Sequence, residues 1–156
     1  WPCTGKEHSV SGYDHEAMMR IALEEAVRSV QEGNSGVGSI IVRDGEVIAR
    51  GRNLVMTQHD ITAHAETVAL REAGAALGTV DLSGCTLYTT YEPCPMCCTA
   101  ILLAGITDVV IGARPAPEER RWPAYTIEWL IDALGMSHMM NVHSGVLAKE
   151  CAEVRP

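Results

Sequence analysis

The chain has 156 residues and a formal net charge of −8, from 20 acidic and 12 basic side chains. This is the size of one ordinary domain, and a content of 47% apolar residues excludes a disordered chain. The longest apolar stretch, residues 100–106, is far shorter than the ~20 residues that span a bilayer, so we expect no membrane segment. No secretion signal is recognisable, so we expect a cytoplasmic protein. The acidic balance disfavours non-specific attraction to nucleic acid, although it is compatible with a local basic patch.

The sequence begins with a segment that has no periodic pattern. Residues 1–12 are expected to form a flexible tail ahead of a single domain over residues 13–156. Apolar residues at helical spacing predict a helix over residues 14–31. Asp14 is the expected N-cap of this helix, and Gly33 can end it in a left-handed conformation.

A hairpin and a second helix are predicted next. Asp44-Gly45 lies between two short apolar runs within residues 37–49. This dipeptide is typical of a type I′ turn, because both central residues of that turn need positive φ. Residues 62–77 are predicted to form a helix with Thr62 as its N-cap.

The second half of the chain alternates strands with helices. The expected elements are a strand at 85–91, a helix at 95–104, a strand at 108–111, a helix opened by Pro123 and ended by Gly135, a strand at 139–142 and a helix at 146–154. A hairpin followed by such alternation predicts an α/β protein, in which helices cover both faces of a mixed five-stranded sheet in a three-layer α/β/α sandwich.

Six cysteines are present, and three of them crowd into residues 94–98. Without a secretory context, this crowding favours metal ligands or buried thiols over disulfides. Cys85, Cys98 and Cys151 are expected to be buried core thiols.

A histidine and a CxxC pair stand at two predicted helix starts. His64 lies near the start of one helix, and Cys94 and Cys97 lie near the start of another. One imidazole and two thiolates suit zinc, and three protein ligands leave a fourth position for water, as in catalytic zinc sites. Glu66, two residues after His64, is the candidate proton carrier. A CxxC pair alone is also compatible with a redox dithiol or with plain buried thiols.

Two motifs carry a resemblance to a known family. Residues 60–66 (DITAHAE) and 90–97 (TYEPCPMC) contain an H-A-E and P-C-x-x-C pattern, which resembles the signature of zinc-dependent nucleoside and nucleobase deaminases. The resemblance covers about residues 14–154 and is to the branch that holds guanine deaminases, fungal-type cytosine deaminases and bacterial tRNA adenosine deaminases. Residues 112–114 (GAR) and 145–151 (GVLAKEC) are most similar to the tRNA-editing members.

The resemblance implies a cytidine deaminase-like fold, one zinc ion per chain and a homodimer or higher homo-oligomer. The implied site residues are the zinc ligands His64, Cys94 and Cys97, the proton shuttle Glu66, and two groups that hydrogen-bond the base, the Asn53 side chain and the Ala65 backbone N–H.

Residues 120–125 (RRWPAY) depart from the family pattern. In the family that this chain resembles, guanine deaminases carry acidic residues in this region. The tRNA editors carry a Gly- and Ser-containing loop here and a basic last helix. Trp122, Tyr125 and Trp129 recur at i, i+3 and i+7, as on one face of a helix. This spacing is compatible with an aromatic lid over a flat base or with packing at a subunit contact. The two arginines of the segment are either a solvated basic pair or a clamp for a carboxylate or phosphate.

Because the basic side chains are few and spread along the chain, the sequence favours a small-molecule substrate. The resulting hypothesis is a zinc-dependent hydrolytic deaminase of a small nucleobase or related amino-heterocycle, such as guanine, cytosine or isocytosine, which releases ammonia. Trp122 and Tyr125 are the expected stacking contacts, and neither nucleic acid nor a membrane is an expected partner. The first alternative is a tRNA-specific adenosine deaminase, and the second is a non-catalytic zinc or redox CxxC module.

Overall fold

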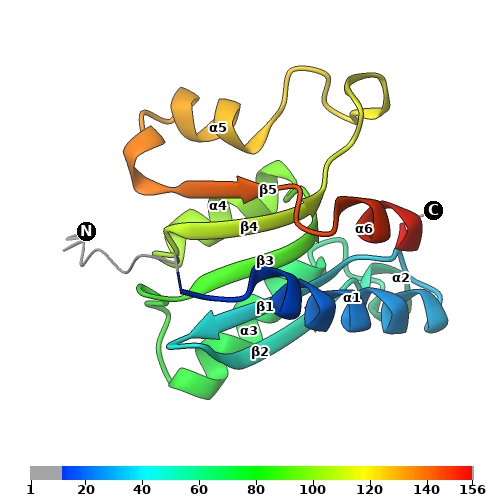
Figure 1. Cartoon of the computed structure of the whole chain (residues 1–156), viewed down its shortest axis with the longest axis horizontal. Helices are drawn as coiled ribbons and strands as arrows, with labels where there is room; N and C mark the ends of the chain where they lie inside the picture. The colour runs from blue at the N-terminus through cyan, green and yellow to red at the C-terminus, as the bar shows by residue number, and fades with distance from the viewer. Residues whose placement is uncertain (1–11, 156) are drawn as a thin grey trace.

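The structure places one sheet between two layers of helices (Figure 1). The computed structural model describes residues 12–155, so the expected tail lies almost entirely outside the described residues. The elements are α1 (His15–Gln31), β1 (Gly38–Arg43), β2 (Glu46–Arg52), α2 (Val55–Gln58), α3 (Ala65–Leu77), β3 (Thr86–Tyr91), α4 (Pro95–Leu103), β4 (Asp108–Ala113), α5 (Ile127–Ala133), β5 (Asn141–Ser144) and α6 (Ala148–Val154), with 3₁₀ turns at Pro117–Glu119 and Ser137–Met139. None of the helices in this part of the chain is long and apolar enough to cross a membrane.

The five strands form one mixed sheet in the order β2-β1-β3-β4-β5. Strand β1 is antiparallel to both β2 and β3, whereas β4 is parallel to β3 and β5 is parallel to β4. The carboxyl ends of β3, β4 and β5 therefore lie at the same edge of the sheet, and the segments that follow these strands meet there. The predicted five-stranded mixed sheet is confirmed.

Both faces of the sheet are covered, which gives the molecule two cores. On one face, Met19 of α1 and Cys151 of α6 pack with Ile40 of β1. On the other face, Ile41 of β1 packs with α3, α4 and α5, including Ile101 of α4. Consecutive residues of β1 serve opposite cores because side chains alternate along a strand. This arrangement confirms the three-layer α/β/α sandwich (Figure 1).

The local signals at the first helix and the hairpin are confirmed. The Asp14 carboxylate accepts the backbone N–H of Ala17 at 3.0 Å and caps α1. Gly33 follows the helix with a φ of 89°. In the hairpin turn, Asp44 and Gly45 have φ values of 52° and 80°, as a type I′ turn requires.

The second predicted helix begins three residues later than expected. Helix α3 starts at Ala65, with His64 rather than Thr62 in the N-cap position. The Thr62 hydroxyl instead donates to the Asp60 carboxylate at 2.7 Å and stabilises the turn before the helix. A short helix that the sequence did not predict, α2, precedes this turn.

The helix predicted to open at Pro123 also begins later, at Ile127. The hydroxyl of Thr126 accepts the backbone N–H of Trp129 at 3.0 Å, so Thr126 is the N-cap. Residues 120–125 therefore form a loop, and the expectation of one helical face carrying Trp122, Tyr125 and Trp129 is wrong.

Gly51 of β2 allows the start of α3 to approach the sheet closely. A Cβ atom at this position would lie 2.3 Å from the backbone carbonyl oxygen of Ala65. Because real Cβ atoms do not approach so closely, any other residue at position 51 would displace the first turn of α3. This turn carries the H-A-E motif.

Candidate metal and substrate site

The two motifs meet at the edge of the sheet where β3 and β4 end. His64 is the N-cap of α3, and Cys94 is the N-cap of α4, with Pro95 in the first helical position and Cys97 in the first turn. Both helices thus direct their N-termini toward the same point, where the partial positive charge of a helix end favours thiolates.

The ligand-type atoms of this cluster have the spacing that a tetrahedral metal requires. The Cys94 Sγ atom lies 3.5 Å from His64 Nδ1 and 3.5 Å from Cys97 Sγ, and Cys97 Sγ lies 3.6 Å from His64 Nδ1. Zinc bonds of about 2.3 Å to sulfur and about 2.0–2.1 Å to nitrogen place tetrahedral ligands roughly 3.5–3.8 Å apart. Among residues 12–155, this group has no fourth metal-binding side chain. The donor set therefore fits zinc with one coordination position left open.

Electrostatics prepare the cluster to bind a cation. The pKa of Cys94 is lowered to about 4, chiefly because of the hydrogen bond between Cys94 and the Cys97 thiol and also because His64 lies beside it. The same hydrogen bond raises the pKa of Cys97. The hydrogen bond between His64 and Cys94 raises the pKa of His64. The cluster thus holds a thiolate at neutral pH, which is the form that a metal binds.

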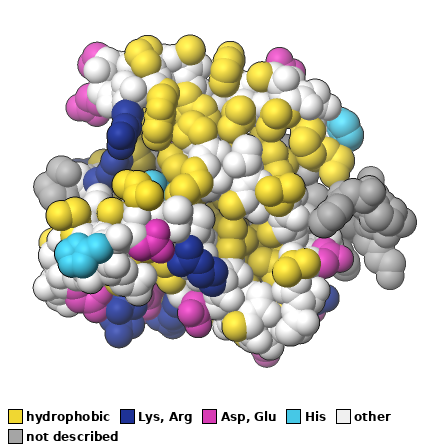
Figure 2. Space-filling view, turned by 180° about the vertical axis from the view of Figure 1, so that it is seen from behind, with side chains coloured by type: hydrophobic (Ala, Val, Ile, Leu, Met, Phe, Trp, Pro, Cys, Tyr) yellow, Lys and Arg dark blue, Asp and Glu magenta, His cyan; other side chains and the backbone are white. Residues whose placement is uncertain are grey.

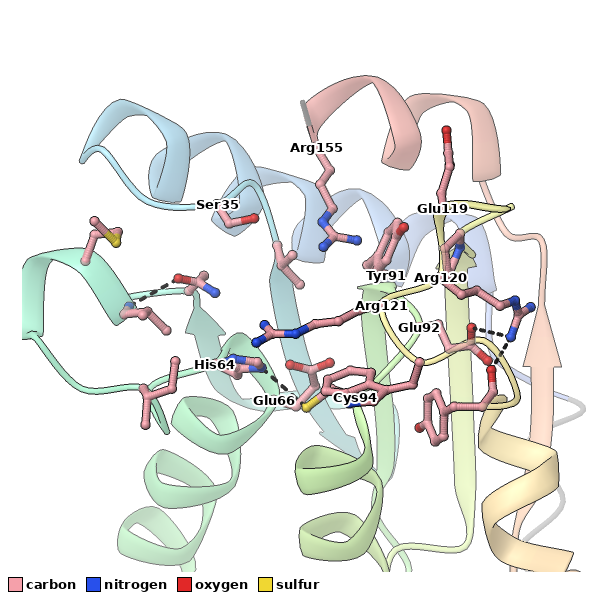
Figure 3. Close-up of a pocket in the computed structure, with 18 residues that line it drawn as sticks. Ser35, His64, Glu66, Tyr91, Glu92, Cys94, Glu119, Arg120, Arg121 and Arg155 are labelled. Atoms are coloured by element: carbon pink, nitrogen blue, oxygen red, sulfur yellow. Dashed lines mark hydrogen bonds and ion pairs between the residues drawn. The ribbon is translucent and has the colours of Figure 1, made fainter. Parts of the chain in front are cut away.

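A buried carboxyl group stands next to the cluster. Glu66 is only 3% exposed, and burial is the main cause that raises its pKa. The Thr89 hydroxyl donates to its Oε1 atom at 3.5 Å. Figure 3 shows the Glu66 carboxylate beside the His64 and Cys94 side chains. A carboxyl group with a raised pKa is suited to take up and release protons near neutral pH.

The cluster opens into a pocket of about 360 Å³ (Figure 3), which is within the usual size range for small-molecule sites. Six of the predicted site residues line it: Asn53, His64, Glu66, Cys94, Trp122 and Tyr125. The other two, Ala65 and Cys97, are fully buried.

The predicted base-binding groups have suitable surroundings. The Oδ1 atom of Asn53 accepts the backbone N–H of Val55 at 3.1 Å. This bond holds the carbonyl end of the amide in place, and the NH₂ end can donate to a ligand. Ala65 is the first residue of α3, and the first N–H groups of a helix have no partner within the helix.

The aromatic residues differ from one another in their positions. Tyr125 lines the pocket but is mostly buried, and its hydroxyl donates to the Pro93 carbonyl oxygen at 2.5 Å. Trp122 lies edge-on to Tyr125 with ring centroids 6.1 Å apart, and 44% of it is exposed. Trp129 lies on α5 and does not line the pocket. Of these three rings, Trp122 is therefore the one most available for contact with a ligand.

A buried carboxylate that the sequence analysis missed holds the loop beside the pocket. Glu92 Oε1 accepts hydrogen bonds from Arg114 Nη1 at 3.1 Å and from the Ile127 backbone N–H at 3.1 Å. Arg120 Nη1 lies 3.9 Å from the other oxygen of Glu92 and donates to the Tyr125 carbonyl. Both ends of the loop are thus attached to the residue that precedes Pro93 and the CxxC motif.

Arginines also gather at the pocket, although the basic residues are dispersed along the sequence. Arg120 and Arg121 of the loop line it together with Arg155, which follows α6. These segments follow the parallel strands β4 and β5. The parallel order of these strands was therefore the signal that could have predicted that the arginines lie close together.

The remaining cysteines in the described residues belong to the cores. Cys85, Cys98 and Cys151 are buried, as predicted. Burial raises the pKa of Cys98 and of Cys151 to about 11, so these thiols are protonated and unreactive at neutral pH.

Comparison with known proteins agrees with this chemistry. Residues 13–113 match the family described as the cytidine and deoxycytidylate deaminase zinc-binding region. The tRNA-specific adenosine deaminase of Bacillus subtilis (strain 168) is 40% identical over 136 residues, which cover 87% of this chain and 83% of the relative. A solved structure from work on A-to-I editing by tRNA:A34 deaminases at the wobble position of transfer RNA is 34% identical, covers 88% of this chain and 98% of its own, and has a TM-score of 0.76. A guanine deaminase structure from Nitrosomonas europaea is 31% identical, covers 89% of this chain and 81% of its own, and has a TM-score of 0.75.

These findings correct the substrate predicted from the sequence. The hypothesis of a free nucleobase substrate without a nucleic-acid partner is wrong, because the extended similarity at 40% identity is to a tRNA-specific adenosine deaminase. The error came from the net charge, which sums over the whole chain and does not show that three arginines line one pocket.

The match over residues 13–113 and the zinc-compatible cluster within it lead to one conclusion. The chain belongs to the cytidine and deoxycytidylate deaminase zinc-binding family, with zinc as its cofactor and hydrolytic deamination as its chemistry.

Proposed function

We propose that this chain is a tRNA adenosine deaminase, which converts an adenosine of a tRNA to inosine within a single domain over residues 13–156. The observation that carries the proposal is an open pocket that joins a zinc-type cluster and a buried carboxyl group to a rim of arginines. The similarity to the Bacillus subtilis enzyme supports the same substrate. Its match of 136 residues is too long to end at residue 113, where the family match ends, so the similarity extends beyond the zinc-binding region.

The reaction replaces the 6-amino group of the adenine ring with oxygen from water and releases ammonia. His64, Cys94 and Cys97 are the proposed zinc ligands. When bound, zinc lowers the pKa of water in its open coordination position toward about 7, so that a nucleophile is available at neutral pH.

Glu66 is the proposed proton shuttle. Its carboxyl group accepts the proton that the attacking water loses, delivers it to the ring nitrogen beside the reacting carbon, and then assists the departure of ammonia. Burial supports this role, because it raises the pKa of Glu66 and keeps bulk water from competing for the proton.

The polar and apolar walls of the pocket orient the base in this proposal. The Asn53 amide and the Ala65 backbone N–H hold the polar edge of the ring. Trp122, Val55 and Ile61 line the pocket with apolar surface on which a flat ring can stack.

Inosine formation tests the function directly. The zinc-loaded chain is incubated with a tRNA anticodon stem-loop that contains one unpaired adenosine, with free adenosine and with guanine. We expect inosine in the RNA and a far slower release of ammonia from the free compounds. A faster turnover of guanine than of the RNA adenosine contradicts the proposal, and a Glu66→Gln variant controls for contaminating deaminases.

We also infer that the chain forms a homodimer. Hydrophobic side chains gather across the face of the molecule opposite to the one seen in Figure 1 (Figure 2). Leu103 at the end of α4 and Val80 after α3 are 72% and 82% exposed, and large exposed apolar patches are typical of subunit contacts. Light scattering tests this inference: a monomeric wild type contradicts it. Leu103→Glu should dissociate the dimer, whereas Val27→Glu on α1, at the other face, should not.

A further inference from the structure

Among residues 12–155, two arginines of the pocket have no acidic partner, unlike most arginines of this chain. Of the ten arginines, seven form ion pairs with Asp or Glu side chains. Within residues 12–155, Arg43, Arg121 and Arg155 form none. Two of these three line the pocket. In a chain with 20 acidic side chains, guanidinium groups without partners are available for an anionic ligand.

Each of the two guanidinium groups lies over an aromatic ring at the pocket. The Cζ atom of Arg155 is 3.6 Å from the ring centroid of Tyr91, and the Cζ atom of Arg121 is 5.3 Å from that of Trp122. Such cation–π contacts favour one orientation of the guanidinium group and leave the donors along its edge free for hydrogen bonds.

The two arginines come from different segments and reach the pocket separately. Arg155 extends from the end of α6 toward Tyr91, whereas Arg121 extends from the loop toward His64 (Figure 3). A ligand that uses both must therefore have negative charge at two separated points. A nucleotide within an RNA strand has this property, because a phosphate lies on each side of its sugar.

The acidic side chains of the pocket offset only part of this charge. Glu66 and Glu92 are buried, and Glu92 is already paired with Arg114 and Arg120. Glu119 is the one exposed acidic residue among the lining residues.

We propose that Arg121 and Arg155 bind the two backbone phosphates that flank the nucleotide whose base enters the pocket. This proposal rests on the proposed function and deepens it. A planar guanidinium group matches the oxygens of a phosphate with two parallel hydrogen bonds, so the pair would fix the register of the strand and direct one base toward Glu66. A free base lacks both phosphates and would not gain from either arginine.

Salt-dependent binding and kinetics with an anticodon stem-loop test the proposal. We expect Arg121→Gln and Arg155→Gln each to raise KM for the RNA three- to tenfold, with kcat nearly unchanged. Each variant should also reduce the slope of log affinity against log salt by about 0.7, the contribution of one phosphate contact to a single strand. Arg155→Lys should retain this slope because it keeps the charge.

Arg43→Gln is the matched control. It removes the same charge from another arginine without an ion pair, at the end of β1 that adjoins the start of β3, away from the site. The proposal is overturned if the two pocket variants bind RNA with the same affinity and salt slope as Arg43→Gln. A methylphosphonate at the flanking linkages should abolish the difference between wild type and the pocket variants. Because RNA binding is measured independently of turnover, absence of inosine contradicts the proposed function while the phosphate contacts are still tested.

Discussion

Removal of the Glu92 carboxylate is the perturbation whose cost the structure defines best. The side chain is 2% exposed and accepts two hydrogen bonds, from Arg114 and from the Ile127 backbone N–H. Loss of one partner of a buried ion pair costs about 3–5 kcal/mol. Two hydrogen bonds that involve a charged group, at about 1.5–3 kcal/mol each, give a similar range. Arg114 retains its contact with Glu128 at 2.6 Å, so we expect the low end for Glu92→Ala, about 3 kcal/mol.

The assay is urea unfolding of the zinc-loaded protein, with zinc content measured in parallel. In thermal unfolding of a chain of this size, a loss of about 3 kcal/mol in the free energy of unfolding corresponds to a Tm lower by about 6–12 °C. Glu92→Gln keeps an acceptor for the Ile127 N–H and should cost about half as much. Because Glu92 also holds both ends of the loop, KM for RNA should rise in both variants.

Glu24→Ala is the control for a surface ion pair. Glu24 lies 3.2 Å from Arg50, but its side chain is 64% exposed, so its removal should cost less than about 1 kcal/mol. If Glu92→Ala costs no more than Glu24→Ala, then Glu92 does not anchor the loop and our account of the pocket wall is refuted.

Three further predictions concern the site. Cys97→Ala should lose zinc and activity, whereas Cys98→Ala, which alters a core thiol, should keep both; metal analysis distinguishes them, and full zinc occupancy in Cys97→Ala would remove Cys97 from the ligand set. Glu66→Gln should keep zinc but lower kcat by at least ~10²–10⁴-fold, and near wild-type turnover would exclude Glu66 as the proton shuttle. Trp122→Ala should raise KM, because Trp122 lines the pocket, whereas Trp129→Ala should not; equal effects in steady-state kinetics would show that Trp122 acts through packing alone.

The elements that could be predicted from the sequence are those with local causes. Asp14 caps a helix, and Asp44-Gly45 forms a turn whose φ values few other dipeptides adopt. The errors arose where two local causes competed. Thr62 and Pro123 both resemble helix starts, but the Thr62 hydroxyl bonds to Asp60, and Thr126 provides a cap further along the chain.

The zinc-type cluster was predictable because ligand chemistry and sequence spacing strongly restrict which residues can form it. His64, Cys94 and Cys97 each stand at a helix start, and their atoms lie at tetrahedral spacing. The pocket wall was not predictable in this way. Glu92 joins Arg114 and the start of α5 across the sheet edge, and no pattern of neighbouring residues reveals contacts between segments this far apart.

The correction of the substrate prediction shows why net charge is a poor guide to a binding partner. Net charge gives equal weight to every side chain, but Glu25 is 1% exposed and lies within ion pairs with Arg28, Arg50 and Arg52. Such paired charges nearly cancel beyond a Debye length of about 8 Å at physiological salt. In the proposed complex, an RNA strand at the pocket would therefore sense mainly the unpaired charges that line it, which are Arg121, Arg155 and the single exposed carboxylate Glu119. A net charge of −8 is thus compatible with the proposed RNA substrate, because position and pairing of charges decide the local potential.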